Sequence, residues 1–395
     1  MSATKRTTVR MAISVKTAEG GRWIVPQILE ARRRGIEVVA VIPAGRGRLA
    51  TSLEELAEND AGFSVVRSAF DFSFRPSIGC VRGLLRLRKQ IKRLDVDVIL
   101  YHLYATALAI RIATLFLPIR RVHMVAGPLY LESRLIRVVE AFLARLDTVI
   151  VCGSEYTRAR YLDIHVPASR LRMVPYGVDL DRFRPPEDKP RSAPDGLRVI
   201  MVAYVYAPKS LAFAGRGIKG HADLLDAWRP FHDRHPHSTL TLVGSGFDEP
   251  GEAYRKRLLT ALPAAPESLG LTWLTSVDDV RSLYEEADVS ISPSLSENHG
   301  AALEASAMGL PCIVSDAGAL PEAVEDASGW VHRAGDPESI ETVLELALAA
   351  KKAQRLDRMG GAARRLMEQE FDQARSAAEV IDIVQTSRPS AERPS

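Results

Sequence analysis

The sequence predicts an α/β protein built from two Rossmann-like domains, and three observations support this fold class. The chain has 395 residues, which is more than a usual single domain contains. Its 46% hydrophobic content is enough to fill two cores. Short apolar runs typical of buried strands alternate with amphipathic helical segments in both halves, and this order predicts parallel sheets covered by helices.

The first half begins with a strand, a turn, a helix and a second strand, in RMAISV, TAEGG, RWIVPQILEARRRG and IEVVAVIP. Gly20 and Gly21 lie in the turn, where the backbone either approaches a ligand or forms only a tight turn. Further strands are expected at DVDVILYHL, RRVHMVAG and LDTVIVCGS, the last of which should close the domain. His102 ends the first of these strands and is better placed for a ligand than His123, although a lone histidine is more often structural.

The domain boundaries follow from composition. Residues 182–196 are rich in proline and charge and predict the linker. We therefore expect one domain at residues 1–185 and a second at 186–365. A helix should follow at 366–386, and the polar, proline-rich residues 387–395 predict a disordered tail.

Charge and cysteine content restrict the function classes. The formal net charge of +3 does not indicate a nucleic-acid partner, but it suits an anionic substrate or a lipid surface. The three cysteines lack paired or metal-ligand spacing, which favours reduced thiols in a cytoplasmic protein. The first residues show no export signal. The apolar run at residues 96–118 contains Asp97, His102 and Arg111, so a buried strand and helix are favoured over a membrane span.

One basic segment leaves two interpretations open. The segment that begins at Val81 and ends at Leu94 carries six cations and no acid, with leucines at helical spacing. Such a helix can lie on anionic lipid at the inner face of a membrane. The alternative is a domain helix with a solvated basic face.

The most informative stretch is residues 284–322. SISPS predicts a buried strand, residues 294–300 a loop, and residues 301–308 a helix that ends before Gly309 and Pro311. Free N–H groups at the start of such a helix favour a diphosphate. Glu297 in the loop and Glu304 in the helix can accept hydrogen bonds from vicinal hydroxyls, one pair from a hexose and one from a ribose.

This stretch resembles the signature of the family 4 retaining glycosyltransferases of the GT-B fold. Three further segments, MVPYGVDLDRFRP, LTLVGSG and KGHADLLDAW, resemble motifs of the same family and follow in its order. The resemblance implies two Rossmann-like domains that face across a cleft, with the C-terminal helix crossing back to the first domain. It also implies transfer of a sugar from a UDP-sugar or GDP-sugar to a hydroxyl acceptor with retention.

The candidate residues divide into two groups. Catalytic roles are assigned to four side chains, namely Glu297, Lys219, Arg216 and His102. Donor binding is assigned to Gly20, Gly21, Gly244, Ser245, Gly246, Thr275, Val277, Asn298, His299, Gly300, Ala301 and Glu304. Glu297 would orient the sugar, Glu304 the ribose, and the two cations would stabilise the leaving diphosphate.

The chain departs from the family pattern at three places. Six residues rather than seven separate the two glutamates. The family's Gly-Arg pair is replaced by Ala203 and Tyr204, and Arg216 in an inserted loop can supply the missing guanidinium. Ala126 stands where the family often has histidine. These departures keep open a nucleotide-sugar-binding protein without transferase activity.

No metal ion or other cofactor is expected. The pairs Asp95 with Asp97 and Asp179 with Asp181 do not end strands as an ion clamp would, so they are interpreted as structural. A nucleotide-sugar epimerase or a phosphorylase can share the two-domain architecture, but neither pattern of catalytic residues is evident. The acceptor can be a glycan, a lipid-linked molecule or a small molecule, held by loops of the first domain.

Overall fold

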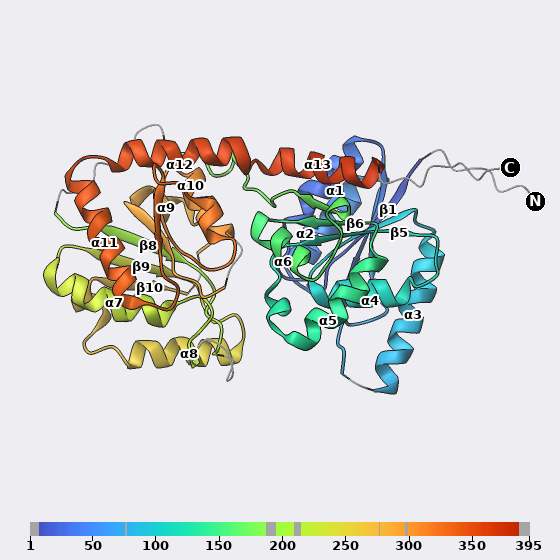
Figure 1. Ribbon diagram of the computed structural model, residues 1–395, viewed down its shortest axis with the longest axis horizontal. Helices are drawn as coiled ribbons and strands as arrows, with labels where there is room; N and C mark the ends of the chain where they lie inside the picture. The colour runs from blue at the N-terminus through green and yellow to red at the C-terminus, as the bar shows by residue number, and fades with distance from the viewer. Residues whose placement is uncertain are drawn as a thin grey trace, which may run out of the picture. The chain divides into compact units, whose positions relative to one another are not determined.

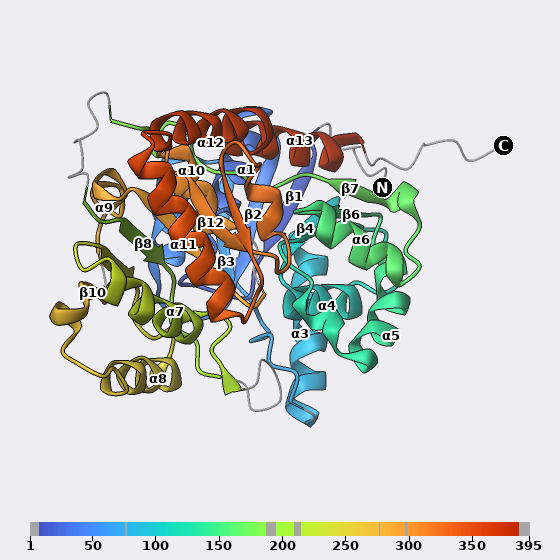
Figure 2. The same ribbon diagram turned by 60° about the vertical axis from the view of Figure 1, so that its left-hand side comes forward.

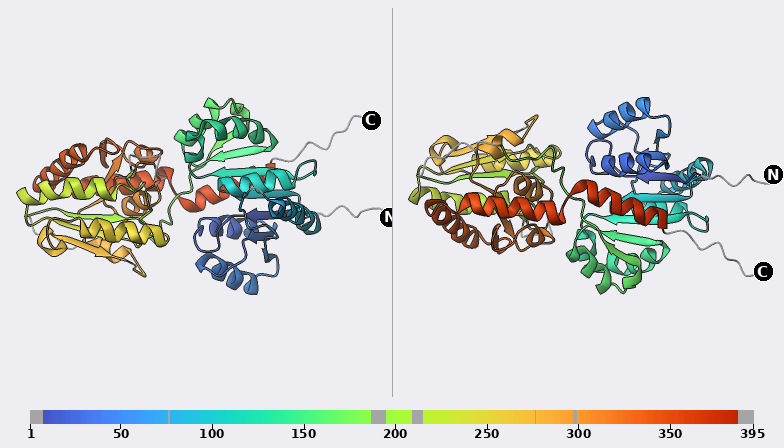
Figure 3. Two further views of the ribbon diagram at one scale, coloured as in Figure 1. Left: turned by 90° about the horizontal axis from the view of Figure 1, so that it is seen from below. Right: turned by 90° about the horizontal axis from the view of Figure 1, so that it is seen from above.

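The computed structural model describes residues 8–75, 77–186, 195–208, 215–275, 277–296 and 299–386 (Figure 1). Contacts within the chain define two compact units. Unit 1 runs from the amino terminus to Tyr176 and takes in the segment from Gln373 onwards, and unit 2 is Gly177–Asp372. Each unit is an α/β domain around one parallel sheet, with helices on both faces (Figure 3).

Unit 1 contains a seven-stranded sheet in the order β3-β2-β1-β4-β5-β6-β7. Its strands are β1 (Arg10–Ser14), β2 (Glu37–Ile42), β3 (Phe63–Arg67), β4 (Val98–His102), β5 (Arg120–Val125), β6 (Val149–Cys152) and β7 (Leu171–Met173). Its α-helices are α1 (Ile24–Arg33), α2 (Arg48–Asn59), α3 (Ile78–Leu94), α4 (Tyr104–Ala113), α5 (Arg134–Leu143), α6 (Glu155–Asp163) and α13 (Gln373–Thr386). Short 3-10 turns are η1 (Leu129–Glu132), η2 (Ala144–Leu146) and η3 (Ala168–Arg170).

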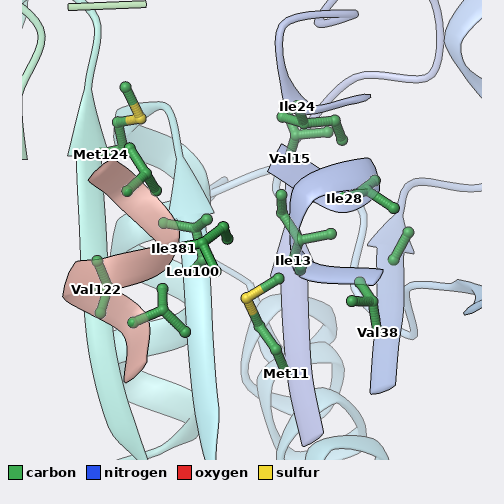
Figure 4. Packing of buried hydrophobic residues seen from close by; sticks show 14 of the residues in the cluster. Met11, Ile13, Val15, Ile24, Ile28, Val38, Leu100, Val122, Met124 and Ile381 are labelled. Carbon is green, nitrogen blue, oxygen red and sulfur yellow. The ribbon is translucent and has the colours of Figure 1, made fainter. Parts of the chain in front are cut away.

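The core of unit 1 joins the beginning of the chain to its last helix. Met11 and Ile13 of β1 pack with Leu100 of β4 and Val122 of β5, as expected for strands buried on both faces (Figure 4). Ile381 of α13 belongs to the same cluster. α13 also lies beside α1, where Arg34 pairs with Asp382 and donates 3.2 Å to the carbonyl oxygen of Ala378. The C-terminal helix is therefore part of the first unit's core.

Unit 2 contains a six-stranded parallel sheet in the order β10-β9-β8-β11-β12-β13. Its strands are β8 (Arg198–Val202), β9 (Thr239–Val243), β10 (Leu271–Leu274), β11 (Val289–Ser292), β12 (Cys312–Ser315) and β13 (Gly329–His332). Its α-helices are α7 (His221–Arg234), α8 (Glu249–Thr260), α9 (Arg281–Glu286), α10 (Gly300–Ala307), α11 (Pro337–Lys352) and α12 (Leu356–Glu370). Two 3-10 turns are η5 (Pro266–Leu269) and η6 (Leu320–Ala323).

The structure corrects two sequence-based expectations about the elements. The strand at residues 149–152 does not close the first sheet, because β7 pairs with it in parallel from Ile150 to Cys152. The helix expected at 366–386 is two helices, since α12 ends at Glu370 and α13 begins at Gln373. At the break, the Phe371 carbonyl oxygen accepts a hydrogen bond from the Val178 backbone N–H at 2.8 Å.

The two units divide between Tyr176 and Gly177, whereas the sequence placed the domain boundary at residue 185. Val178 and Phe183 are buried in a hydrophobic cluster of unit 2. Arg364 of α12 donates 2.6 Å to the carbonyl oxygen of Phe183. Residues 177–185 are thus held by the second unit. Most of the expected linker, at 187–194, and the expected tail at 387–395 lie outside the described residues.

The apolar run at 96–118 forms β4 and α4, and no helix among the described residues has the length and apolar content needed to cross a membrane. Beneath this part of the sheet, Arg111 of α4 is fully buried between two carboxylates. It donates to both oxygens of Glu140 at 2.7 and 3.0 Å and also pairs with Asp147. Tyr161 donates 2.8 Å to Glu140, so the buried charges are hydrogen-bonded as well as paired.

Replacing Arg111 with methionine is expected to destabilise unit 1 by about 3–5 kcal/mol, because two buried carboxylates lose their counter-charge. Arg33→Met is the matched control, since Arg33 forms an equally short pair with Glu30 at the surface. Chemical denaturation of both variants measures the difference. Equal losses of unfolding free energy would contradict a stabilising role of the buried ion group.

Candidate functional site

The sheet of unit 2 has a topological switch point between β8 and β11. These strands are parallel neighbours, and the chain leaves β8 toward β9 on one side and β11 toward β12 on the other. Ligands of open α/β sheets bind outside the carboxyl ends of strands at such a point. The segment that follows β8 carries Lys219, and the segment that follows β11 leads to α10. The topology therefore brings Lys219, an expected catalytic residue, and the expected donor-binding residues of α10 to one edge of the sheet.

Two contacts fasten these segments to each other. The Leu295 N–H donates 2.8 Å to the carbonyl oxygen of Ile218. Gly220 has a φ of +74°, and a Cβ atom there would lie 1.9 Å from the carbonyl oxygen of Pro293. Only glycine allows both the left-handed backbone and this close approach. The fold therefore requires glycine at the second position of the Lys-Gly pair before α7.

The two expected cations have different surroundings. Lys219 is half-buried, and burial lowers its pKa to about 8, so it is mostly protonated at neutral pH. Arg216 forms an ion pair with the buried carboxylate of Asp223, and its Nη1 lies 3.7 Å from Asp226. The sequence suggested Arg216 as a replacement for the family's arginine. In the structure its guanidinium is shared with carboxylates of α7, and Lys219 lies three residues further along the same segment.

Among the described residues at the amino terminus of α10, the N-cap residue His299 makes no side-chain capping hydrogen bond. His299 precedes the helix, and its carbonyl oxygen accepts the first helical hydrogen bond from Leu303 at 2.9 Å. Its ring packs edge-on against Phe371, with centroids 5.3 Å apart, and burial lowers its pKa to about 4. Gly300 is exposed, with open space around it. Glu297 and Asn298, two of the expected site residues, lie outside the described residues.

Glu304 lies one turn into α10, below Ala301. Burial raises the pKa of its carboxyl group to about 7, although the charge of Arg182 acts in the opposite direction. The neighbouring Tyr284 is fully buried, and its hydroxyl donates 3.5 Å to the Ala301 carbonyl oxygen. Glu304 is therefore near its titration midpoint at neutral pH rather than a fully ionised helix cap. A carboxyl group in this state is sensitive to hydroxyl donors placed next to it.

The turn from Gly244 to Gly246 is packed against the end of β8. A Cβ atom at Gly244 would lie 2.1 Å from the Ala203 carbonyl oxygen. The Ser245 carbonyl oxygen accepts 2.9 Å from Val205, and the Gly246 N–H donates 2.9 Å to Glu252. The glycines of this turn are therefore explained by close backbone packing, whether or not a ligand also contacts them.

Sequence analysis gave His221 no role, yet it links this turn to α7. Its ring stacks on Trp273 with centroids 5.5 Å apart, and the Trp273 indole N–H donates 3.0 Å to Gly244. Its position directly after the Lys-Gly pair is the sequence feature that could have indicated a role for His221 in the site. Thr275 is exposed nearby in the sequence, whereas Val277 packs against the hydrophobic core of unit 2.

His102 in unit 1 ends β4 and is fully buried. Its Nδ1 lies 3.0 Å from the hydroxyl of Tyr176, which donates 3.3 Å to the Met124 carbonyl oxygen. Which of the two groups donates in this pair depends on the tautomer of the imidazole ring. Nε2 has no partner among the described residues, and burial lowers the His102 pKa to about 3. Tyr176 was not identified from the sequence.

The Gly20–Gly21 turn follows β1, the strand beside β4 at the switch point of this sheet. Gly21 has a φ of +101°, and its carbonyl oxygen accepts 3.1 Å from Ile24 at the start of α1. The Thr17 hydroxyl accepts 3.3 Å from Gly20. A Cβ at Gly20 would meet no atom within 4 Å. The turn is thus held by its own hydrogen bonds, with open space beside Gly20.

Two family models match the chain, and together they cover most of it. The model described as Glycosyltransferase Family 4 matches residues 23–182, and the model described as Glycosyl transferases group 1 matches residues 208–349. The chain belongs to the family 4 glycosyltransferases and has the GT-B type of fold.

Known relatives are similar over part of their length. A D-inositol 3-phosphate glycosyltransferase of Corynebacterium jeikeium is 33% identical over 180 residues, which is 42% of this chain and 41% of that protein. A GDP-mannose-dependent alpha-(1-6)-phosphatidylinositol monomannoside mannosyltransferase of Mycolicibacterium smegmatis is 28% identical over 210 residues, 50% of this chain and 52% of that one. The chain thus spans about half the length of these curated relatives.

Solved structures are similar over nearly the whole chain. A glycosyltransferase from Rickettsia africae has a TM-score of 0.77 at 16% identity and covers 98% of this chain and 100% of its own. Anabaena Alr3699/HepE, solved in complex with UDP-glucose, has a TM-score of 0.75 at 16% identity, with 96% and 100% covered. At this identity the likeness concerns the fold alone.

Gly220→Ala should destabilise unit 2 by about 3 kcal/mol or more, because the new Cβ needs both a left-handed backbone and displacement of Pro293. Gly215→Ala is the control. Gly215 has a similar φ of +77°, and a Cβ there would meet no atom of the described residues within 4 Å, so about 1 kcal/mol is expected from the backbone alone. Thermal and denaturant unfolding measure both. Similar losses would mean that the contact between the two segments is not tight.

Proposed function

We propose that the protein is a retaining glycosyltransferase that moves a sugar from a nucleoside diphosphate sugar to a hydroxyl acceptor. The observation that carries the proposal is the fastening of the Lys219 turn to the segment before α10. This contact supports a diphosphate site at the switch point, where a cation and a helix amino terminus both favour negative charge. Glu304 is one helical turn away and suits the ribose hydroxyls.

We assign each step to this chain's own groups. Lys219 and the N–H groups of α10 stabilise the leaving diphosphate, with Arg216 contributing while paired to Asp223. We propose that this step uses no metal ion, since side-chain cations and the helix dipole can stabilise the leaving group. Glu297 keeps its assigned role of orienting the sugar. His102, which ends β4 in unit 1, keeps its proposed catalytic role on the acceptor side.

The donor is proposed to be a UDP-sugar or a GDP-sugar. One structural neighbour was solved with UDP-glucose, and one relative is named as GDP-mannose-dependent. The acceptor is a glycan, a lipid-linked molecule or a small molecule, and two relatives are named for inositol-containing acceptors. A protein that binds nucleotide sugars without transfer, and an epimerase, are the alternatives to be separated by assay.

We further propose a cytoplasmic location with peripheral membrane contact through the helix from Val81 to Leu94. In the structure this segment lies in α3, whose Leu87 and Ile91 pack into the core. Its outward face instead exposes Val81 and Leu85, together with most of the helix's cations. Apolar and basic side chains on one face favour contact with anionic lipid.

The first test is a panel of UDP- and GDP-sugars measured by thermal shift, followed by turnover with the best donor. We expect sugars of one nucleotide, UDP or GDP, to stabilise the protein against thermal unfolding. The protein should also hydrolyse that donor slowly without an acceptor and release the free nucleoside diphosphate. Glu304→Ala should weaken donor binding, and Glu297→Ala should slow transfer more than it weakens binding. Stabilisation without any release would favour the non-catalytic binder, and an altered free nucleotide sugar would favour the epimerase.

Donor affinity should be greatest between about pH 7 and pH 8. If hydroxyls of the donor bind the ionised Glu304, affinity falls as pH drops below its pKa of about 7. If the diphosphate binds protonated Lys219, affinity falls as pH rises above its pKa of about 8. Calorimetric titration across this range measures both limbs.

Each limb has its own variant. Glu304→Gln should abolish the fall in affinity at low pH and keep the fall at high pH. Lys219→Arg should abolish the fall at high pH and keep the fall at low pH, because arginine stays charged. A wild-type affinity that does not change with pH across both pKa values would refute the placement of the two groups at the donor.

A further inference from the structure

Helix α5 of unit 1 has its apolar side turned toward solvent. Leu135, Val138 and Phe142 are 74%, 59% and 64% exposed, and Val139 is also exposed. At 3.6 residues per turn these positions fall on one continuous face. The opposite face carries Glu140, which is fully buried. An ordinary surface helix has the reverse arrangement, with apolar residues inward and charges outward.

The buried ion pairs of Glu140 prevent α5 from rotating about its axis to bury its apolar face. Glu140 accepts two hydrogen bonds from Arg111 and one from Tyr161, at 2.7, 3.0 and 2.8 Å. Rotating α5 to bury Phe142 would separate these charges inside the domain. The outward direction of the apolar face is therefore fixed by the fold. A contiguous exposed apolar face of this kind marks an interaction surface.

The charges around this face are positive. Exposed Arg134 and Arg145 lie along one edge of it, and the Arg145 guanidinium lies 5.6 Å from the centre of the Phe142 ring. No acidic residue of α5 is exposed. The nearest acid in the sequence, Glu132, is paired with Arg160 at 3.0 Å. An apolar face with a basic edge complements an anionic lipid surface, where arginines bind headgroups and apolar side chains enter the interface.

The same side of unit 1 carries α3. Figures 1 and 2 show α3, α4 and α5 on the side of the sheet opposite α1 and α13. α3 exposes Ile78, Val81 and Leu85 among its cations. Two helices on one side thus combine exposed apolar residues with positive charge.

We propose that the exposed face of α5, formed by Leu135, Val138, Val139 and Phe142 with Arg134 and Arg145, docks on an anionic membrane surface. A second copy of the chain is a poorer occupant, because α5 exposes no acidic residue that could pair with the arginines of another copy. The proposal is independent of sugar transfer, since binding to lipid needs no donor. It adds to α3 a second docking element whose apolar content is greater than its charge.

The test uses the full-length protein and vesicles of phosphatidylglycerol mixed with phosphatidylcholine, with vesicles of phosphatidylcholine alone for comparison. We expect binding to the anionic vesicles that weakens at least about tenfold in Val138→Glu/Phe142→Glu. Arg134→Gln/Arg145→Gln should weaken binding about fivefold or more per charge and reduce its salt dependence. Leu346→Glu on α11 is the matched control, because Leu346 is 50% exposed but lies in unit 2; it should bind as the wild type does.

Equal vesicle binding by the wild type and the Val138→Glu/Phe142→Glu variant would overturn the proposal. So would equal binding to neutral and anionic vesicles. Light scattering after gel filtration measures whether the protein forms a dimer. A dimer that dissociates in the α5 variant, without loss of vesicle binding, would assign this face to a second copy instead. Thermal unfolding of each variant checks that the fold is intact, and none of these measurements depends on transferase activity.

Discussion

The candidate donor site depends on one close backbone contact in unit 2. Gly220 approaches the Pro293 carbonyl oxygen more closely than any residue with a Cβ can, and Leu295 donates a hydrogen bond to Ile218 beside it. Through these contacts the segment after β8 and the segment after β11 behave as one structure. Without them, the cation and the helix amino terminus would belong to two independently moving loops, and neither could be preorganised for a diphosphate.

Burial acts on the two titratable groups of this site in opposite directions. It disfavours the charged form of each, so it raises the pKa of Glu304 to about 7 and lowers that of Lys219 to about 8. Both groups are therefore poised near neutral pH, which is common at functional sites. A bound donor would supply hydroxyls to the carboxylate and negative charge to the amine, and so would favour the charged form of both.

The sequence predicts most of the fold, because buried parallel strands and their helices leave strong periodic signals. It fails where a short contact decides the outcome. β7 has only three residues, and the helix expected across residues 366–386 breaks where Phe371 accepts a hydrogen bond from Val178. In the site, Lys219 follows β8 and α10 follows β11, and the roles assigned to them stay predictions. The pairing of Arg216 with Asp223 and the contact of His102 with Tyr176 are tertiary and leave no local pattern.

The central claim is that Lys219 and Glu304 bind different parts of one nucleoside diphosphate. The most direct measurement compares affinities for the diphosphate and for its nucleoside in Lys219→Met and Glu304→Gln, using UDP with uridine and GDP with guanosine. We expect Lys219→Met to weaken binding of the diphosphate alone, whereas Glu304→Gln should weaken binding of both ligands. An equal effect of Lys219→Met on the nucleoside, or no effect on the diphosphate, would contradict it.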